Sequence, residues 1–527
     1  MSHVTLAPSP HAPRPLAGEP TAAEELDELL DLDRHKLSVI PKKEPTPGER
    51  WMKYFGLPGG LLIFALLVSV PTPTGLTGAG QAVLALFSMC LVWWVTEPIA
   101  THVTSLILIA GLVLMNAWEQ DKVLAVLGLD VIWLNITAFI LSSILVKTNL
   151  ARRLALTMFV AFGGSAVQTF GAFLGVQLVL AAFIPATAAR AVMTLPLMMV
   201  AAAIYGSTAG QPTNFGRNLF LLNLLGINIF SSAFMTGSAA NLNAVTFMES
   251  MGGEKIYYTT WLLGGLPVAL ITMLAAWWLG PGWLFPLAEK DRTPHIQGGI
   301  DALRRQRDRM GPMSFAEKKA AVLFGFVLIL WTTDQFHLSL FGFEIEAVIA
   351  ALLGAIITFL PGVGLLQWNE ADIPWHLMIF SAGAYAGGMA LDQSGAARWA
   401  IEGVLGFFHI TRETPFWALY AGAMALMIYS HLFFTSKTMR TMIIIPFVIL
   451  TAKTLGYKAS SLALPAAFTI DWVVGLPISA KPNVILYTTG QYSVVDNLKF
   501  GVLVCTVGYL VLLLAGATWF RFLGIIP

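Results

Sequence analysis

Long apolar stretches, separated by short polar segments, follow one another along most of the chain after its first 50 residues. They include residues 57–70, 82–95, 101–115, 260–279, 321–332 and 500–520. Many approach the roughly 20 apolar residues that a helix needs to cross the hydrocarbon core of a bilayer. The pattern therefore predicts an all-α integral membrane protein with about 11 transmembrane helices, several of them interrupted.

The polar segments divide the chain into parts. Basic residues gather before residue 54 and again within residues 286–320, and an excess of Lys and Arg is typical of cytoplasmic segments. Residues 1–53 lack the apolar core of a secretory signal, so we predict that they remain as a cytoplasmic tail. Residues 286–320 are then a cytoplasmic linker between a first membrane repeat with an extra first helix, residues 54–285, and a second repeat, residues 321–527.

Composition narrows the class of function. Only 12% of the residues are charged, against about 25% in soluble proteins, and a net charge of +1 argues against a nucleic-acid partner. The two cysteines, Cys90 and Cys505, supply neither a disulfide framework nor a metal cluster. The sequence has no HExxH, GxSxG or GK[ST] motif, so a membrane-embedded enzyme has little chemistry to use. We predict no catalytic residue, no metal site and no cofactor beyond a coupling cation.

The two halves of the chain resemble each other. ATAARAVMTLP, residues 186–196, aligns with SKTMRTMIIIP, residues 436–446, and this places Arg190 over Arg440 at an offset of 250 residues. Three further pairs follow in the same order at similar offsets: Glu97 with Glu346, Arg153 with Arg398, and Asn241 with Asn483. Collinear matches of this kind indicate an internal repeat.

The predicted orientation implies that the repeats are inverted. With the linker inside and the C-terminus outside, the second half has an odd number of spans. Carriers built this way bind substrate between the repeats, where re-entrant hairpins and broken helices offer free amides to anions and free carbonyls to cations. We expect helix interruptions at Pro196 and Pro446, and next to Asn241 and Asn483, which follow short runs of small residues or proline.

Three longer motifs carry a resemblance to a known family. They are WWVTEPIATHVTSL at residues 93–106, DIPWHLMIFSAGAYAGGMAL at residues 372–391 and LPISAKPNVILYTTGQYSVVDNLKFG at residues 476–501. Together they resemble the divalent anion:sodium symporter family, the carriers of di- and tricarboxylates and sulfate. The resemblance implies a homodimer in the bilayer and an elevator-type movement of a transport domain against a scaffold. An arginine at position 190 also resembles the bacterial citrate, tartrate and oxoglutarate exchanger branch, which implies a bacterial inner membrane.

The chain departs from this family at both hairpin tips. The family has Ser-Asn-Thr at each tip, whereas this chain has Ala-Thr-Ala at residues 186–188 and Ser-Lys-Thr at residues 436–438. Two unit charges about 4 Å apart repel by roughly 4 kcal/mol at an effective dielectric constant of about 20. The Lys437 ammonium therefore disfavours sodium at the second tip. Sodium stays possible at the first, with Thr187 and Asn241 as candidate ligands.

The candidate substrate-binding residues gather at the tips and at the expected breaks. They are Thr187, Arg190, Ser238, Asn241, Ser436, Lys437, Thr438, Arg440, Pro482 and Asn483. Arginine suits a carboxylate because its planar fork binds both oxygens. In the alternative interpretation, the arginines extend to an interface or pair with an acid such as Asp471, and the asparagines only cap helices.

These observations predict a secondary active transporter of small multivalent anions, most consistent with di- or tricarboxylates. Lys437 would pair with a substrate carboxylate, and transport would be exchange or proton-linked. A sodium- or proton-coupled symporter of dicarboxylate or sulfate is an alternative, and a passive anion channel is the alternative of another class. The sequence leaves the identity of the anion open.

Overall fold

The structure is a computed structural model that describes residues 47–208, 211–296, 299–434, 436–477 and 479–527. Within these residues the regular secondary structure is helical, as the sequence predicts. Most of the predicted tail lies outside the described residues, and the first described helix already begins at Pro47. The described part of the chain is therefore all-α.

Within the described residues, eleven α-helices precede the linker. They are α2 (Pro47–Ser69), α3 (Gly78–Thr96), α4 (Thr101–Leu114), α5 (Gln120–Ala125), α6 (Asp130–Lys147), α7 (Leu150–Phe162), α8 (Ala166–Phe183), α9 (Thr187–Ile204), α10 (Asn214–Ala233), α11 (Ala239–Ser250) and α12 (Tyr258–Leu279). The linker contains α13 (Gly299–Arg309).

The second half begins at Phe315, within the segment that the sequence assigns to the linker. Its helices are α14 (Phe315–Thr332), α15 (His337–Phe341), α16 (Ala347–Phe359), α17 (Trp375–Gln393), α18 (Ala396–Phe407), α19 (Phe416–Tyr429), α20 (Lys437–Thr454), α21 (Ala459–Ala467), α22 (Lys481–Tyr487) and α23 (Val494–Ala515). Local sequence fixes the start of α14, because Ser314 and Glu317 form a capping box that satisfies two free amides.

Length and hydropathy identify the helices that can cross a membrane. In the described part of the chain seven helices are long and apolar enough, and α14 with the bent segment after it makes an eighth. Three shorter apolar helices add to these: Thr101–Leu114, Ala347–Phe359 and Phe416–Leu432. The chain is therefore a multi-pass membrane protein, and the predicted number of spans stays a prediction.

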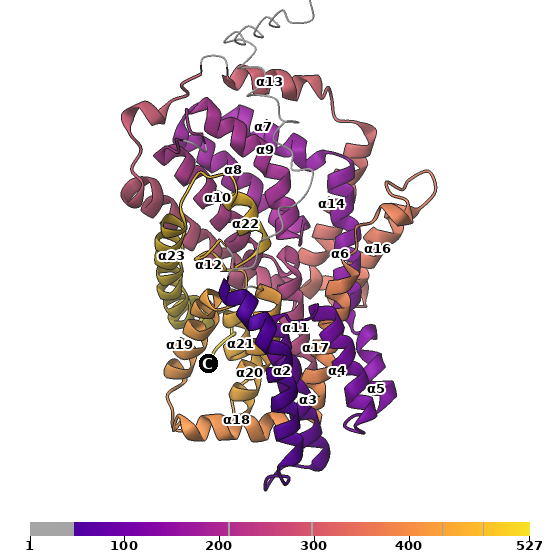
Figure 1. Ribbon diagram of the computed structural model, residues 1–527. Helices are drawn as coiled ribbons and strands as arrows, with labels where there is room; N and C mark the ends of the chain where they lie inside the picture. Colours follow the sequence, from indigo (N-terminus) through magenta and orange to yellow (C-terminus); the bar gives the residue numbers. More distant parts are fainter. Residues whose placement is uncertain (1–46, 209–210, 297–298, 435, 478) are drawn as a thin grey trace, which may run out of the picture.

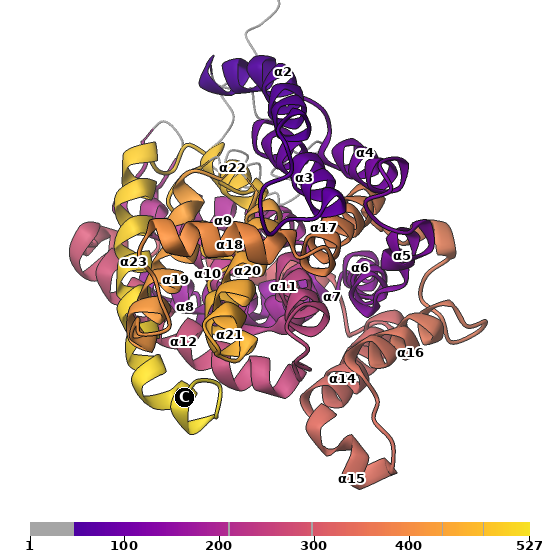
Figure 2. The ribbon, with the colours of Figure 1, turned by 90° about the horizontal axis from the view of Figure 1, so that it is seen from below.

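The helices form two groups, and each group contains helices from both halves (Figures 1 and 2). In one group α4 packs against α17, and α6 packs against α16. In the other, α10 packs against α8 and α12, α20 packs against α21, and α12 packs against α23. Helices α7 and α18 connect the two groups along the chain. The hairpin α8–α9 lies in the upper half of Figure 1 and the hairpin α19–α20 in the lower half, and the inverted orientation of the repeats stays a prediction.

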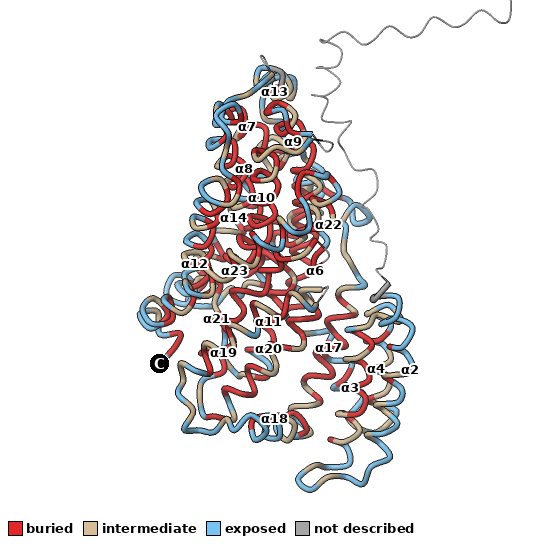
Figure 3. Tube along the Cα trace, turned by 60° about the vertical axis from the view of Figure 1, so that its left-hand side comes forward, coloured by how far each residue is buried: buried red, intermediate tan, exposed pale blue. Residues whose placement is uncertain are grey.

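Burial is greatest in the second group. Figure 3 shows buried residues along α10, α20 and α21, whereas much of α2 is exposed. Leu61, Leu62 and Leu66 of α2 are 49%, 61% and 55% exposed. A continuous exposed apolar face of this kind marks a surface that meets lipid. The second group is therefore the protected place in which buried polar groups can persist.

The predicted breaks are confirmed next to the asparagines and wrong at the prolines. α10 and α11 are separated before Asn241, and α21 and α22 before Asn483. Pro196 and Pro446, however, lie inside the continuous helices α9 and α20. A membrane helix tolerates proline when neighbouring groups satisfy the freed carbonyl. The hairpins turn before the first residues of α9 and α20 instead.

Arg153 joins the first half to the end of the linker. Its Nε donates to Glu317 Oε1 at 2.5 Å, and its Nη1 donates to the carbonyl of Gly311 at 2.8 Å. The two charged side chains are 14% and 4% exposed. Its counterpart in the repeat alignment, Arg398, pairs with Glu402 while 73% exposed.

We expect Arg153→Met to lower the free energy of unfolding by roughly 3 kcal/mol, because a mostly buried carboxylate loses its partner. Arg398→Met is the matched control and should change it by less than about 1 kcal/mol, as for other exposed pairs. Thermal unfolding of the two purified variants measures both effects. Equal midpoints for the two would contradict a structural role for Arg153.

Candidate functional site

The two hairpin tips lie against the broken helices of the opposite halves. α9 packs against α22, and α20 packs against α11, so the same contact occurs twice with the halves exchanged. The first tip is the extended segment 184–186, followed by Thr187 as the first residue of α9. The second tip ends at Ser436, which precedes α20. The first amides of a helix have no partner within it, so both tips present groups that attract negative charge.

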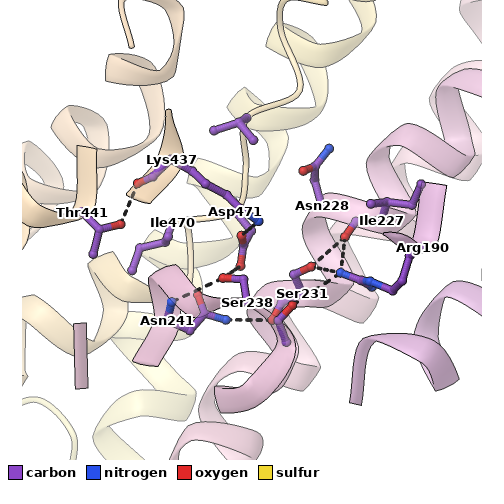
Figure 4. Close-up of polar contacts among 12 residues, drawn as sticks. Arg190, Ile227, Asn228, Ser231, Ser238, Asn241, Lys437, Thr441, Ile470 and Asp471 are labelled. Carbon is purple, nitrogen blue, oxygen red and sulfur yellow. Dashed lines mark hydrogen bonds and ion pairs between the residues drawn. The ribbon is translucent and has the colours of Figure 1, made fainter. Parts of the chain in front are cut away.

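Asp471 joins three elements at the second tip (Figure 4). It lies in the irregular segment between α21 and α22, and its side chain is fully buried. Lys437 Nζ donates to Asp471 Oδ1 at 2.5 Å, and Ser238 Oγ donates to Asp471 Oδ2 at 2.9 Å. Burying a carboxylate is costly unless it is paired and hydrogen-bonded. The lysine that the sequence suggested as a partner of substrate is therefore paired with an internal acid in this structure.

Arg190 is fully buried and holds the end of the broken helix α10. Its Nη2 donates to the carbonyl of Ile227 at 2.9 Å and also to the hydroxyl of Ser231. A longer contact reaches the carbonyl of Gly237 at 3.5 Å. Arg190 thus links the first hairpin to the break between α10 and α11.

Arg440 makes the equivalent contact in the second half. It is also fully buried, and its Nη2 donates to the carbonyl of Ile470 and, at 3.4 Å, to that of Thr469. In the described part of the chain, Nε and Nη1 of both Arg190 and Arg440 lack a hydrogen-bond partner. Each arginine therefore fixes broken-helix carbonyls with one nitrogen and keeps two donors unused.

Asn241 closes the first break. Its Nδ2 donates to the carbonyl of Ser231, ten residues earlier, at 2.9 Å, and to that of Phe234, seven residues earlier, at 3.1 Å. Its Oδ1 is buried and has no hydrogen-bond partner among the described residues. An amide oxygen of this kind is a suitable ligand for a hard cation.

Asn483 closes the second break with the same spacing. Its Nδ2 donates to the carbonyls of Val473 and Leu476, again ten and seven residues earlier, at 2.5 and 2.9 Å. Unlike its counterpart, its Oδ1 accepts a hydrogen bond from Asn228 Nδ2 at 3.1 Å. These contacts fit the interpretation that both asparagines cap helix ends. Of the two side-chain oxygens, that of Asn241 is the one left without a partner among the described residues.

The remaining predicted residues occupy the ends of the same helices. Ser436 Oγ caps α20 by accepting from the amide of Met439 at 3.3 Å, and Thr438 is the second residue of that helix. Thr187 begins α9 and is buried, and Pro482 is buried at the start of α22. All ten predicted residues thus lie at the tips or at the breaks that face them.

Sequence reasoning missed the central role of Asp471, which it named only as a possible partner of the arginines. The signal was an acidic residue inside an otherwise apolar and small-residue stretch, which is rare in membrane segments unless it has a function. Ser231, which contacts Asn241 at the first break, and Asn228, which donates to Asn483 at the second, were also missed. Polar residues are common enough in this chain that their positions alone did not distinguish them.

The cluster carries a net positive charge. Lys437, Arg190 and Arg440 supply three cations, and Asp471 supplies one carboxylate that acts electrostatically on all of them. The remaining charge of plus two lies in a buried region, where electrostatic interactions are stronger than in water. The cluster is therefore suited to an anion.

Two cavities lie away from this cluster and are less suited to an anion. One, of 340 Å³, lies among the ends of α6, α11, α12 and α16. Its charged lining residues are Lys255 and the acids Asp130, Glu249, Glu254, Asp334, Glu344 and Glu346. The other, of 390 Å³, is an apolar groove between α14 and α16 with Lys318 and Lys319 at its edge. Charge therefore favours the hairpin tips as the candidate site.

The chain is similar to known membrane proteins over most of its length. Residues 50–526 match the sodium:sulfate symporter transmembrane region. A membrane protein of Cupriavidus necator is 27% identical, over 91% of this chain and 94% of that protein. The sodium-dependent dicarboxylate transporter SdcS of Staphylococcus saprophyticus is 25% identical over 83% of this chain and 86% of that protein. The same-named protein of Staphylococcus aureus is 24% identical over 90% of this chain and 92% of that protein. The crystal structure of the Alcanivorax borkumensis YdaH transporter aligns with a TM-score of 0.49 at 12% identity, over 91% of this chain and 99% of that one.

Proposed function

Because the chain belongs to the sodium:sulfate symporter family, the divalent anion:sodium symporters that its motifs resemble, we propose that it carries dicarboxylates across a membrane. Family membership makes it a secondary transporter of anions and not an enzyme, which confirms these two predictions. The substrate, the coupling and the movement belong to the proposal.

The observation that carries the proposal is the buried cationic cluster between the hairpin tips. Arg190 and Arg440 come from matched positions of the two halves, and each keeps unused donors. A substrate with a carboxylate at each end suits a site that has one guanidinium from each half, because guanidinium binds carboxylate through paired hydrogen bonds. The names of the two SdcS relatives, which are dicarboxylate transporters, support the same choice.

We propose an elevator-type movement for the transport cycle. The group with α8–α12 and α19–α23 holds the buried polar cluster, and the group with α4, α6, α16 and α17 faces it from the side. The first group is the transport domain and the second the scaffold. The carrier works as a homodimer in a bacterial inner membrane, with the tail at residues 1–53 and the linker at residues 286–320 in the cytoplasm.

Coupling is proposed to be exchange, with Lys437 in place of a second sodium ion. The Lys437 ammonium lies against Asp471, so a cation bound there would face a positive charge instead of a free carboxylate. The first break differs, because Asn241 Oδ1 has no hydrogen-bond partner among the described residues and Thr187 begins α9, whose Arg190 reaches the same break. A single sodium ion at this first break is the alternative, and it would make the protein a symporter like its sodium-dependent relatives.

The test is uptake of labelled succinate into proteoliposomes that contain either buffer or unlabelled dicarboxylate, with and without external sodium. We expect saturable uptake that requires internal dicarboxylate and persists without sodium. Uptake that rises steeply and saturably with sodium would reject exchange and leave a sodium-coupled carrier. Uptake that does not saturate would indicate a channel. An absence of dicarboxylate uptake would favour sulfate as the substrate.

A further inference from the structure

Asp471 supplies a carboxylate to a cluster whose other charged groups are cations. It contacts Lys437 and Ser238 directly, and its charge also acts on Arg190 and Arg440. An acid at this place opposes the binding of an anion, because it neutralises part of the attraction and repels the ligand.

The three elements that meet at Asp471 belong to both halves. Ser238 caps α11, Lys437 begins α20, and Asp471 lies between α21 and α22 (Figure 4). The side chain is fully buried, whereas that of Lys437 is 14% exposed. The acid therefore lies behind the lysine, inside the contact between the second tip and the first break.

We propose that Asp471 is a specificity-determining residue that sets the charge of the transported anion at minus two. It offsets one of the three cations, so that the site accepts a dianion and discriminates against a trianion. This inference rests on the proposed function, which already names a dianion, and adds to it the residue that enforces this charge preference. A dianion neutralises the remaining charge, whereas a trianion leaves one negative charge uncompensated in a buried region next to Asp471.

The test compares succinate, a dianion, with citrate, a trianion near neutral pH, in the same proteoliposomes. The variant Asp471→Asn keeps the shape of the side chain and an oxygen that can accept from Ser238, and it removes the charge. We expect it to raise the ratio of citrate to succinate uptake by at least about tenfold relative to the parent. An unchanged ratio in a folded variant would overturn the inference.

Two further variants separate charge from local damage. Lys437→Met combined with Asp471→Asn removes both members of the pair and keeps the net charge of the cluster, so it should return the ratio toward that of the parent. Asp308→Asn removes an exposed acid of the linker, 58% exposed, and should leave the ratio unchanged. A double variant that keeps the raised ratio would show that net charge does not decide the preference.

The parent protein alone provides a measurement that does not depend on the variants folding. Lowering the pH converts citrate from trianion to dianion, so parent uptake of citrate should rise as the dianion becomes abundant. Citrate uptake that is greatest where the trianion prevails would overturn the inference even if the parent also carries succinate. Parent vesicles that take up no carboxylate at any pH would instead reject the proposed function, and with it this inference.

Discussion

Lys437→Asn is expected to lower succinate exchange in sodium-free buffer by at least about 100-fold, and to make the remaining transport depend on sodium. The mutation leaves the fully buried Asp471 carboxylate without its cation. Breaking a buried pair in this way costs about 3–5 kcal/mol, and each 1.4 kcal/mol corresponds to about a tenfold change. A sodium ion can then take the place of the ammonium beside Asp471. Succinate uptake with and without sodium, measured on the parent and the variant, gives both the loss of sodium-free exchange and the gain of sodium dependence.

The control for this experiment is Lys481→Asn, which removes an exposed lysine at the start of α22. It should transport like the parent. A Lys437→Asn protein that exchanges succinate at the parent rate without sodium would contradict the role of the lysine as a built-in cation. So would a parent protein that already needs sodium for every turnover.

Arg190→Gln and Arg440→Gln are expected to be similarly damaging, and to act on stability as well as transport. Each arginine donates to carbonyls at or next to a helix break. Hydrogen bonds from charged groups contribute about 1.5–3 kcal/mol each, so either variant should lose roughly 3 kcal/mol or more of stability. Lysine should not rescue either position, because a single ammonium lacks the planar fork. Thermal unfolding in detergent measures the loss, and vesicle uptake measures its effect on transport.

Arg412→Gln serves as the comparison, since Arg412 is exposed in the segment before α19. It should be indistinguishable from the parent in both measurements. If the arginine variants raised KM for succinate while the unfolding midpoint stayed at the parent value, the arginines would contact only the substrate. The proposed role in holding the breaks would then be wrong.

Much of the architecture could be predicted from sequence because it depends on local pattern. Apolar length identified the helices, and small residues before Asn241 and Asn483 identified the breaks. The repeated segments around Arg190 and Arg440, together with the family resemblance, identified the two hairpin tips. Pro196 and Pro446 were misinterpreted because proline is not a reliable helix breaker in a membrane, where neighbouring helices can satisfy the freed carbonyl.

The charge state of the site could not be predicted in the same way. Asp471 lies 34 residues from Lys437 and 233 residues from Ser238 in the chain, so no spacing rule connects them. The sequence showed that Lys437 departs from the family pattern, but only the three-dimensional contact shows what neutralises it. The sequence-based prediction therefore paired Lys437 with the substrate and gave it no partner within the protein.

The hydrogen bonds of Asn241 and Asn483 have a consequence for the order in which the protein is assembled. Each asparagine reaches carbonyls no more than ten residues earlier, and closing so short a loop has a small entropic cost. Each break can therefore take its shape as soon as its own segment has entered the membrane during synthesis. The contact between Ser238 and Asp471 must wait until almost the whole chain has been made. A ribosome that stops within the second half would leave a first half with a correctly shaped break but without the carboxylate that completes the site.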